Sequence, residues 1–168
     1  ITKPLGAGFY PADMTREDFN GWLEAHPEDR ESFMRFTTLI RRREGRYVSI
    51  PYSHAYALEL EKAAKLLQEA AGMTTNASLR HFLNTRAEAL LNNDYAESDG
   101  AWIGLDSDIE VVFGPYETYE DQLFGYKATF EAFIGYRNAE ETARLKHIES
   151  LVDEMQGVLP ISDAMKST

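Results

Sequence analysis

The stretch Ile109–Tyr136, IEVVFGPYETYEDQLFGYKATFEAFIGY, predicts two β-strands joined by an acidic and aromatic loop. From Tyr126 to Tyr136 apolar or small residues occupy every second position, a period typical of a strand with one buried face. The opposite face would carry Lys127, Thr129, Glu131 and Phe133. The first run, Ile109–Phe113, is short and rich in β-branched and aromatic residues. Gly114-Pro115 should end it, because proline cannot donate a hydrogen bond to a neighbouring strand.

Carboxylates, tyrosines and glycines gather in the loop between these strands, and its candidate site residues are Glu117, Tyr119 and, on the second strand, Glu131. A hydrolase that cuts a peptide bond needs donors aimed at the developing oxyanion, and a tyrosine hydroxyl can be one. An exopeptidase also needs an anion for the free α-ammonium of its substrate, which a glutamate can supply. On an extended segment Glu117 and Tyr119 would project to the same side. The plainer alternative is that Tyr119 packs on Phe124 and Glu117 is solvated.

The four histidines, His26, His54, His81 and His147, form no metal-binding motif. None stands in H-E-x-x-H, and no two are four residues apart on one predicted helix. Cysteine is absent, which excludes thiolate ligands, and there is no G-x-S-x-G nucleophile motif. Arg86-Ala87-Glu88 is too isolated to count as part of a Nudix box. We therefore expect this chain alone to contain no metal ligand and no catalytic nucleophile.

The amino-acid composition is typical of a folded, acidic protein. Its 168 residues, 43% of them hydrophobic, are enough for one domain with a real core. The net charge of -11 opposes binding to nucleic acid, and no apolar run is long enough to cross a membrane. The arginines at 41–43 and 46 favour a solvated hairpin over a phosphate site, because the cluster is short and flanked by Glu44. The lack of cysteine fits a reducing compartment, so a cytoplasmic location is expected.

Helical patterns dominate residues 13–92. Thr15 with Asp18 three residues later predicts a capped first helix, and Pro27 begins a second one. The remaining expected elements are a β-hairpin over residues 37–50 (with a helix through Ile40–Glu44 as the alternative), a helix over His54–Ala71 capped by Ser53, and a helix over about Asn76–Leu91. The last two helices should pack as an antiparallel pair, because only about four residues join them.

The predicted strand pair is flanked by a polar segment and a final helix. Asn92–Ser107 is rich in turn residues and acids, but its spacing does not match a calcium-binding loop, so a solvated loop is favoured. Asn138, with Glu141 three residues later, predicts the start of a helix over 139–156. Gly157 and Pro160 should end it.

The loop and second strand resemble the segment that precedes the zinc site in the dipeptidyl peptidase III family and its bacterial zinc-hydrolase relatives. Those enzymes carry a Glu-x-Tyr pair, a glycine, and then Phe-Glu-x-Phe on a strand. The matching residues are Glu117-Thr118-Tyr119, Gly125 and Phe130–Phe133. Phe9–Phe19 and Ile50–Leu67 look like the N-terminal part of the bacterial relatives. This chain departs from the pattern at Glu120, where the eukaryotic enzymes have a basic residue, and at Thr129, which replaces an acid.

The resemblance implies that Glu117 holds the N-terminus of a peptide, that Tyr119 assists the transition state, and that Glu131 supports the cleft. It also implies zinc in a longer parent protein, bound by an H-E-x-x-G-H helix and a further glutamate outside this chain. The absence of an initiator methionine agrees with a piece of a larger protein.

Taken together, these patterns predict an α+β fold, mainly helical, with a small antiparallel sheet from the hairpin near 37–50 and the strands near 109–113 and 126–136. Residues 1–168 would form a single domain of a larger hydrolase: the substrate-side portion of a zinc-dependent metallopeptidase. Its partners would be a small peptide-like substrate and the rest of the parent chain. The alternatives are a non-catalytic binding or scaffold domain, and a hydrolase named Nudix by association.

Overall fold

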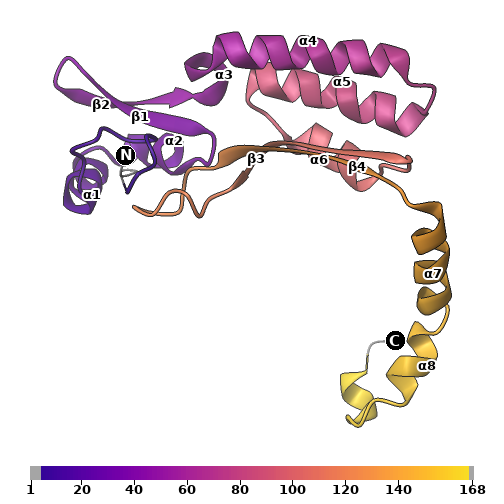
Figure 1. The fold of residues 1–168 in the computed structure, drawn as a ribbon. Helices are drawn as coiled ribbons and strands as arrows, with labels where there is room; N and C mark the ends of the chain where they lie inside the picture. Colours follow the sequence, from indigo (N-terminus) through magenta and orange to yellow (C-terminus); the bar gives the residue numbers. More distant parts are fainter. Residues whose placement is uncertain (1–4, 167–168) are drawn as a thin grey trace. The chain divides into compact units, whose positions relative to one another are not determined.

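The computed structural model describes residues 5–166, which divide into two compact units (Figure 1). The first unit ends at Ile134 and contains α1 to α6, the first sheet, and the second sheet except for the last two residues of its second strand. The second begins at Gly135 and contains α7 and α8. Mainly helical elements with two antiparallel two-stranded sheets confirm the predicted α+β class, although the strands form two sheets rather than one.

The N-terminal helices begin as their caps predict. Helix α1 (Arg16–Ala25) starts after Thr15, whose hydroxyl accepts the Asp18 N–H at 3.1 Å. The Asp18 carboxylate in turn accepts the Thr15 N–H at 3.0 Å, which completes a capping box. Pro27 then opens a 3-10 turn, η1 (Pro27–Asp29), followed by α2 (Arg30–Met34).

The hairpin predicted over residues 37–50 is confirmed, and the alternative helix through Ile40–Glu44 is wrong. Strand β1 (Thr38–Arg43) pairs antiparallel with β2 (Arg46–Pro51), from Thr38 opposite Pro51 to Arg43 opposite Arg46. Glu44 and Gly45 form the turn with φ values of 50° and 78°. Two successive left-handed residues suit the twist of a tight hairpin, and this turn excludes a continuous helix.

Next along the chain, the short helix α3 (Tyr52–Ala55) leads into α4 (Ala57–Met73), which lies antiparallel beside α5 (Ala77–Asn92) in Figure 1. The predicted cap at Ser53 is wrong, because Ser53 lies inside α3. Asn76, predicted only as the approximate start of the next helix, is its cap and accepts the Leu79 N–H at 2.9 Å.

An additional helix, α6 (Ala96–Ile103), replaces part of the loop expected over Asn92–Ser107. Asn93, in the left-handed conformation with φ 64°, ends α5, and Asp94 then accepts the Ala96 N–H at 3.2 Å. Glycine and short polar residues make this segment look like a loop, but its packing against α5 stabilises the helix.

The second sheet pairs β3 (Ile109–Glu117) with β4 (Thr129–Tyr136). Strand β3 continues through Gly114-Pro115, so the predicted stop there is wrong. In a two-stranded sheet each strand has a free edge, where the missing N–H of a proline costs little. The predicted alternation over 126–136 is largely wrong. Ala128 is buried as expected, but Lys127, predicted on the opposite face, is buried as well, and Ile134 and Tyr136 of the predicted buried face are exposed.

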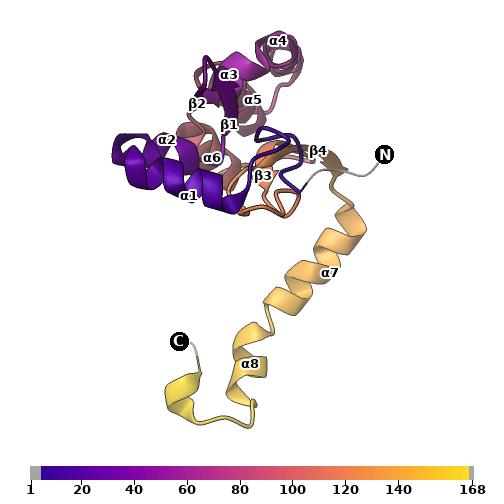
Figure 2. The same ribbon diagram turned by 90° about the vertical axis from the view of Figure 1, so that its left-hand side faces the viewer.

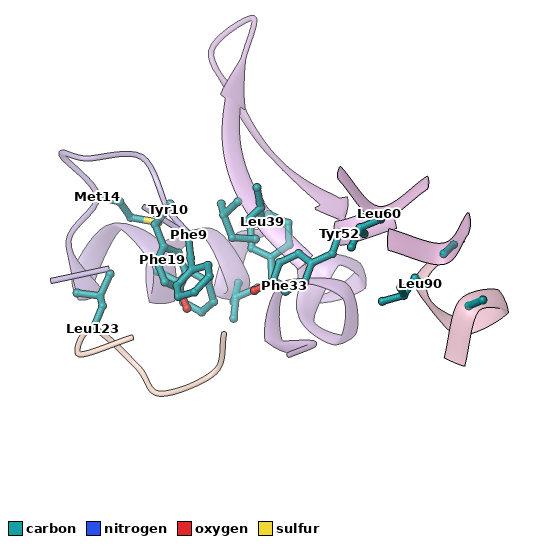
Figure 3. Packing of buried hydrophobic residues seen from close by; sticks show 14 residues of the cluster. Phe9, Tyr10, Met14, Phe19, Phe33, Leu39, Tyr52, Leu60, Leu90 and Leu123 are labelled. Carbon is teal, nitrogen blue, oxygen red and sulfur yellow. The ribbon is translucent and has the colours of Figure 1, made fainter. Parts of the chain in front are cut away.

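The core of the first unit joins the N-terminal segment, the helices and the loop after β3. Figure 3 shows aromatic and aliphatic side chains from these segments packed in one cluster. Its members are Phe9, Tyr10, Met14, Phe19, Leu23, Phe33, Leu39, Ile40, Tyr52, Leu60, Ala64, Ala87, Leu90 and Leu123. The loop that follows β3 is thus anchored in the core at Leu123.

In the second unit, α7 (Ala139–Glu149) is separated from α8 (Val152–Gly157) by Ser150 and Leu151, where a single helix over 139–156 was predicted (Figure 2). The predicted cap is confirmed: Asn138 accepts the N–H groups of Glu140 and Glu141. A 3-10 turn, η2 (Asp163–Met165), follows. No helix within residues 5–166 combines the length and apolar character that crossing a membrane requires.

Candidate functional site

The three predicted site residues lie at the junction between β3 and β4. Glu117 is the exposed last residue of β3, Tyr119 lies in the turn that follows and is 67% exposed, and Glu131 is half-buried on β4. The Thr129 hydroxyl donates to the Glu117 carbonyl at 2.9 Å, so the start of β4 is tied to the end of β3. In the described chain, however, these three side chains form no hydrogen bond or ion pair with one another.

The ring of Tyr119 is not part of the aromatic cluster around Phe124. Phe124 instead packs on Phe19, Tyr10 and Tyr126, with a ring separation of 4.4 Å from Phe19. The loop therefore buries its later aromatic residues and leaves the Tyr119 phenol directed to solvent.

Asp121 organises this loop from within. Its carboxylate is 2% exposed and accepts the backbone N–H groups of Leu123 and Phe124 on Oδ1 and of Tyr126 and Lys127 on Oδ2, at 3.0–3.2 Å. The Tyr10 hydroxyl donates to Oδ2 at 2.7 Å. Burial, followed by the hydrogen bond to this carboxylate, raises the pKa of Tyr10 far above its ordinary value. A buried carboxylate is tolerable here because donors surround it.

Lys127 anchors the end of the loop to α2. Its fully buried ammonium donates to the carbonyls of Phe33 and Arg35 and to the Thr38 hydroxyl, the latter two at 2.8 Å. Burial lowers the pKa of Lys127 to about 7, and the Asp121 carboxylate partly opposes that change. These bonds satisfy carbonyls at the end of α2 that would otherwise lack partners.

Two more hydrogen bonds fix the backbone after Lys127. The Ala128 N–H donates to the Phe36 carbonyl, and the Tyr52 hydroxyl donates to the Ala128 carbonyl, both at 2.9 Å. Burial raises the pKa of Tyr52 well above its ordinary value, so this hydroxyl stays a donor. The second half of the loop is therefore held by both the N-terminal helices and the core.

A buried arginine holds β3 just before the candidate residues. Arg86 of α5 is fully buried, and its Nη2 pairs with the Asp99 carboxylate at 2.6 Å. The rings of Phe82, Tyr95 and Tyr116 surround its guanidinium, with each centroid 5.4–5.5 Å from Cζ. Nε and Nη1 have no hydrogen-bond acceptor, so the ring faces provide part of their electrostatic compensation.

An open cavity of about 850 Å³ borders this cluster. Pro115 and Tyr116 of β3 line it together with Phe36, Asn93, Tyr95 and Asp99. Glu117 and Tyr119 do not line this cavity, although Glu117 directly follows Tyr116, which does.

Sequence reasoning missed Asp121, Lys127 and Tyr10, which give the loop its shape. One signal was available for Asp121, because an aspartate two to three residues before backbone N–H groups in a turn can accept their hydrogen bonds. The alternating pattern placed Lys127 on the outer face, and its burial could not be foreseen without knowledge of the α2 carbonyls. Tyr10 lies far away in sequence, and no local pattern links it to the loop.

The residues that the structure describes do not by themselves fit a zinc site. Across residues 5–166 no three histidine, aspartate or glutamate side chains are grouped so that they could hold a metal ion. The four histidines lie on separate elements: His26 ends α1, and His54, His81 and His147 belong to α3, α5 and α7.

Comparison with known proteins decides the family. The sequence model of peptidase family M49 matches residues 22–164, which include both β3 and β4 and the loop between them. The chain belongs to peptidase family M49. The match with the M49 model contains all three candidate site residues and the Asp121 network, although it begins after Tyr10.

Solved M49 relatives share the fold closely. The structure of DPP III from Caldithrix abyssi is 55% identical and superimposes with a TM-score of 0.91, and that of dipeptidyl-peptidase III from Corallococcus sp. strain EGB is 43% identical with a TM-score of 0.82. Both comparisons cover 99% of this chain and 32% of the solved chain. An Arabidopsis thaliana protein named Nudix hydrolase 3 is 40% identical over all of this chain, which spans 25% of its length. This chain thus spans a quarter to a third of the length of these relatives.

Proposed function

We propose that this chain is the substrate-side portion of a dipeptidyl peptidase III-like hydrolase. The observation that carries the proposal is the contrast within the loop after β3. Its second half is buried or hydrogen-bonded, whereas the carboxylate and the phenol at its start are exposed. Membership of family M49 and the two solved relatives named DPP III support a peptidase reaction. A rigid base beneath exposed polar groups is the arrangement that substrate binding requires.

In this proposal Glu117 and Tyr119 contact the substrate. The Glu117 carboxylate pairs with the free α-ammonium at the N-terminus of a small peptide, which fixes the distance from that end to the bond that is cut. The Tyr119 hydroxyl donates a hydrogen bond to the oxygen that gains charge in the transition state. Glu131, half-buried on β4, supports the same wall of the cleft.

Zinc belongs to this proposal as a component of the parent protein. Since the described residues assemble no metal-binding group, the ligands would come from elsewhere in that polypeptide. When bound, a zinc ion polarises a carbonyl and activates a water molecule. What this chain contributes is orientation: it holds the amino terminus of the peptide and presents a donor.

The proposed setting follows from the same features. The residues would form one domain of the parent protein, and the rest of that chain would supply the opposite wall of the cleft. A cysteine-free, acidic sequence is compatible with the cytoplasm, and a small peptide with a free amino terminus is the proposed substrate.

The name of the Arabidopsis relative raises a second function, phosphoanhydride hydrolysis of the Nudix type, but nothing within this chain favours it. Arg86, part of the short Arg-Ala-Glu sequence at 86–88, is buried and paired with Asp99 rather than exposed to a ligand. The experiment below distinguishes the proposal from a purely non-catalytic binding role.

The test is peptide hydrolysis by the full-length protein carrying Tyr119→Phe. Loss of one oxyanion donor should lower kcat by roughly ten- to a thousandfold. Tyr136→Phe is the matched control, because Tyr136 is also an exposed tyrosine but lies outside the loop, and it should retain wild-type activity. Wild-type kcat in the Tyr119→Phe enzyme would reject the proposal, whereas an inactive parent protein would favour the binding role.

A further inference from the structure

The loop between β3 and β4 has two parts with opposite exposure. Glu117 and Tyr119 are exposed, whereas Asp121 and Leu123 are buried and Lys127 is fully enclosed. The change occurs at Asp121, so this residue separates the proposed substrate-contacting part from the part fixed in the core.

The backbone of Asp121 closes the turn that carries Tyr119. Its N–H donates to the Thr118 carbonyl at 3.1 Å, and Tyr119 and Glu120 lie within the turn. The direction of the Tyr119 side chain from the backbone is therefore set by where Asp121 is held. On the other side, the Thr129 hydroxyl fixes the carbonyl of Glu117. Both exposed residues thus depend on bonds made by their neighbours rather than on contacts of their own.

The side chain of Asp121 needs both of its oxygens as acceptors. Oδ1 accepts two backbone N–H groups, while Oδ2 accepts two more and the Tyr10 hydroxyl. An asparagine would have the same shape, but its NH₂ group would replace one of the two acceptor oxygens. That group cannot accept a hydrogen bond from the donors that face it. The carboxylate is thus chemically specified at this position, beyond what filling the space would require.

Tyr10 links this network to the rest of the fold. Its ring packs on Phe19 and Phe124, and its hydroxyl reaches Asp121 across 111 positions in sequence. The loop is therefore held by a group whose own position depends on the N-terminal segment and α1.

We infer that Asp121, held by Tyr10, is a positioning residue that fixes the exposed Glu117–Tyr119 segment against its substrate. This inference rests on the proposed function, because it assigns to Asp121 an effect exerted through Tyr119 and Glu117. Asp121 itself, being buried, touches no substrate.

The first experiment measures kcat and KM of the full-length enzyme with Asp121→Asn and, separately, Tyr10→Phe. A displacement of about 1 Å can cost about a hundredfold in rate, so Asp121→Asn should lower kcat/KM by about that factor. Tyr10→Phe removes one hydrogen bond and keeps the four backbone bonds, so its loss should be several times smaller. Thr85→Val is the control for an equally buried hydroxyl, since Thr85 bonds only within α5, and it should keep wild-type kinetics.

The second experiment separates positioning from general damage by a double-mutant cycle. If Asp121 acts through the phenol, Asp121→Asn should lower kcat/KM by a much smaller factor in the Tyr119→Phe enzyme than in the wild type. Losses that multiply independently in the double variant would overturn the inference. If Asp121→Asn does not fold, the cycle is measured with Tyr10→Phe, with the same criterion.

Hydrogen exchange gives a readout that does not depend on activity. In Asp121→Asn the amides of Leu123, Phe124, Tyr126 and Lys127 should exchange faster, whereas those of α4 and α5 should not change. Unchanged loop exchange would contradict the inference. If Tyr119→Phe and Glu117→Gln both retain full activity, the proposed function itself fails. If those variants lose activity and Asp121→Asn does not, only the positioning role of Asp121 fails.

Discussion

Asp121, Lys127 and Arg86 are three charged side chains buried in an acidic protein, and each is compensated in a different way. Asp121 accepts backbone N–H groups, Lys127 donates to carbonyls at the end of α2, and Arg86 pairs with Asp99 inside a ring of aromatic faces. Removing one partner from such a group leaves the other buried without compensation, which usually costs more than the bond is worth.

The depressed pKa of Lys127 predicts a pH dependence of stability. In the unfolded chain this lysine keeps its proton to about pH 10.5, whereas in the folded chain it loses it near pH 7. Between these values the unfolded state binds more protons, so folding stability contributed by Lys127 should rise with pH, by at most ~1.4 kcal/mol per pH unit. Denaturant unfolding from pH 6 to about pH 10 measures it.

Lys127→Met is the reference for this measurement, because it removes the titrating group. The difference in unfolding free energy, wild type minus variant, should increase from about pH 7 upward. A difference that stays constant with pH, or falls, would show that the Lys127 ammonium stays protonated in the folded protein throughout this range.

The surroundings of two glycines predict opposite effects of an alanine substitution on stability. A Cβ on Gly114 would lie 2.9 Å from Arg86 Nη1 and 2.9 Å from Tyr116 Cζ, so Gly114→Ala should destabilise the chain by ~1–3 kcal/mol. Gly100, inside α6, has nothing within 4 Å of such a Cβ, and Gly100→Ala should stabilise the chain by ~0.5–1 kcal/mol. Thermal unfolding compares them, and equal shifts for both would refute the packing described around Arg86.

Helix and strand positions followed from the sequence where the signal was local. The capping residues Thr15 and Asn138 start helices as predicted, and the turn at Gly45 marks the hairpin. Helix α6 was missed, because its short polar residues and glycine favour a loop until α5 packs against it. Strand β3 passes through Pro115 because its free edge needs no donor there, and periodicity cannot report which edge is free.

The candidate site was predictable only in its exposed part. Glu117, Tyr119 and Glu131 could be selected because their residue types suit peptide chemistry and match a family pattern. The groups that fix them, Asp121 and Tyr10, are joined by a contact between distant parts of the chain. Such contacts are determined by tertiary packing, which local periodicity does not encode.

The cap of α5 offers a test of the observed helix boundaries. Asn76→Ala removes the acceptor of the Leu79 N–H and the bond from Asn76 Nδ2 to the Asp106 carbonyl, so it should cost ~1–2 kcal/mol of stability. Ser53→Ala, at the cap predicted from sequence and not observed, should change stability by less than ~0.5 kcal/mol. Chemical denaturation of both variants compares them. A larger loss at Ser53 would contradict the observed helix boundaries.

At the scale of the whole molecule, the second unit carries many exposed apolar side chains. In the second unit, Leu145, Ile148, Val152, Met155 and Val158 are all exposed. Large apolar side chains gathered on short helices usually mark a surface that another part of the protein covers. Because this chain spans about a third of its solved relatives, the rest of the parent polypeptide is the proposed cover.

Hydrogen exchange tests whether the rest of the parent polypeptide covers α7 and α8. Their amides should exchange rapidly in the isolated chain and at least tenfold more slowly in the full-length protein, because docking suppresses local opening. The amides of α5, which is buried within the first unit, serve as the internal control and should be protected in both. Equal exchange of α7 in the two proteins would show that these helices remain uncovered.

The claim that the loop after β3 binds the amino terminus of a peptide is tested most directly through Glu117. The measurement is the ratio of kcat/KM for a peptide with a free amino terminus to that for its N-acetylated form, in the full-length enzyme with and without Glu117→Gln. Loss of a charge-assisted pair worth ~1.5–3 kcal/mol should lower this ratio by roughly ten- to a hundredfold. Glu110→Gln, an exposed carboxylate at the other end of β3, should leave it unchanged. An unaltered ratio in Glu117→Gln would contradict the account.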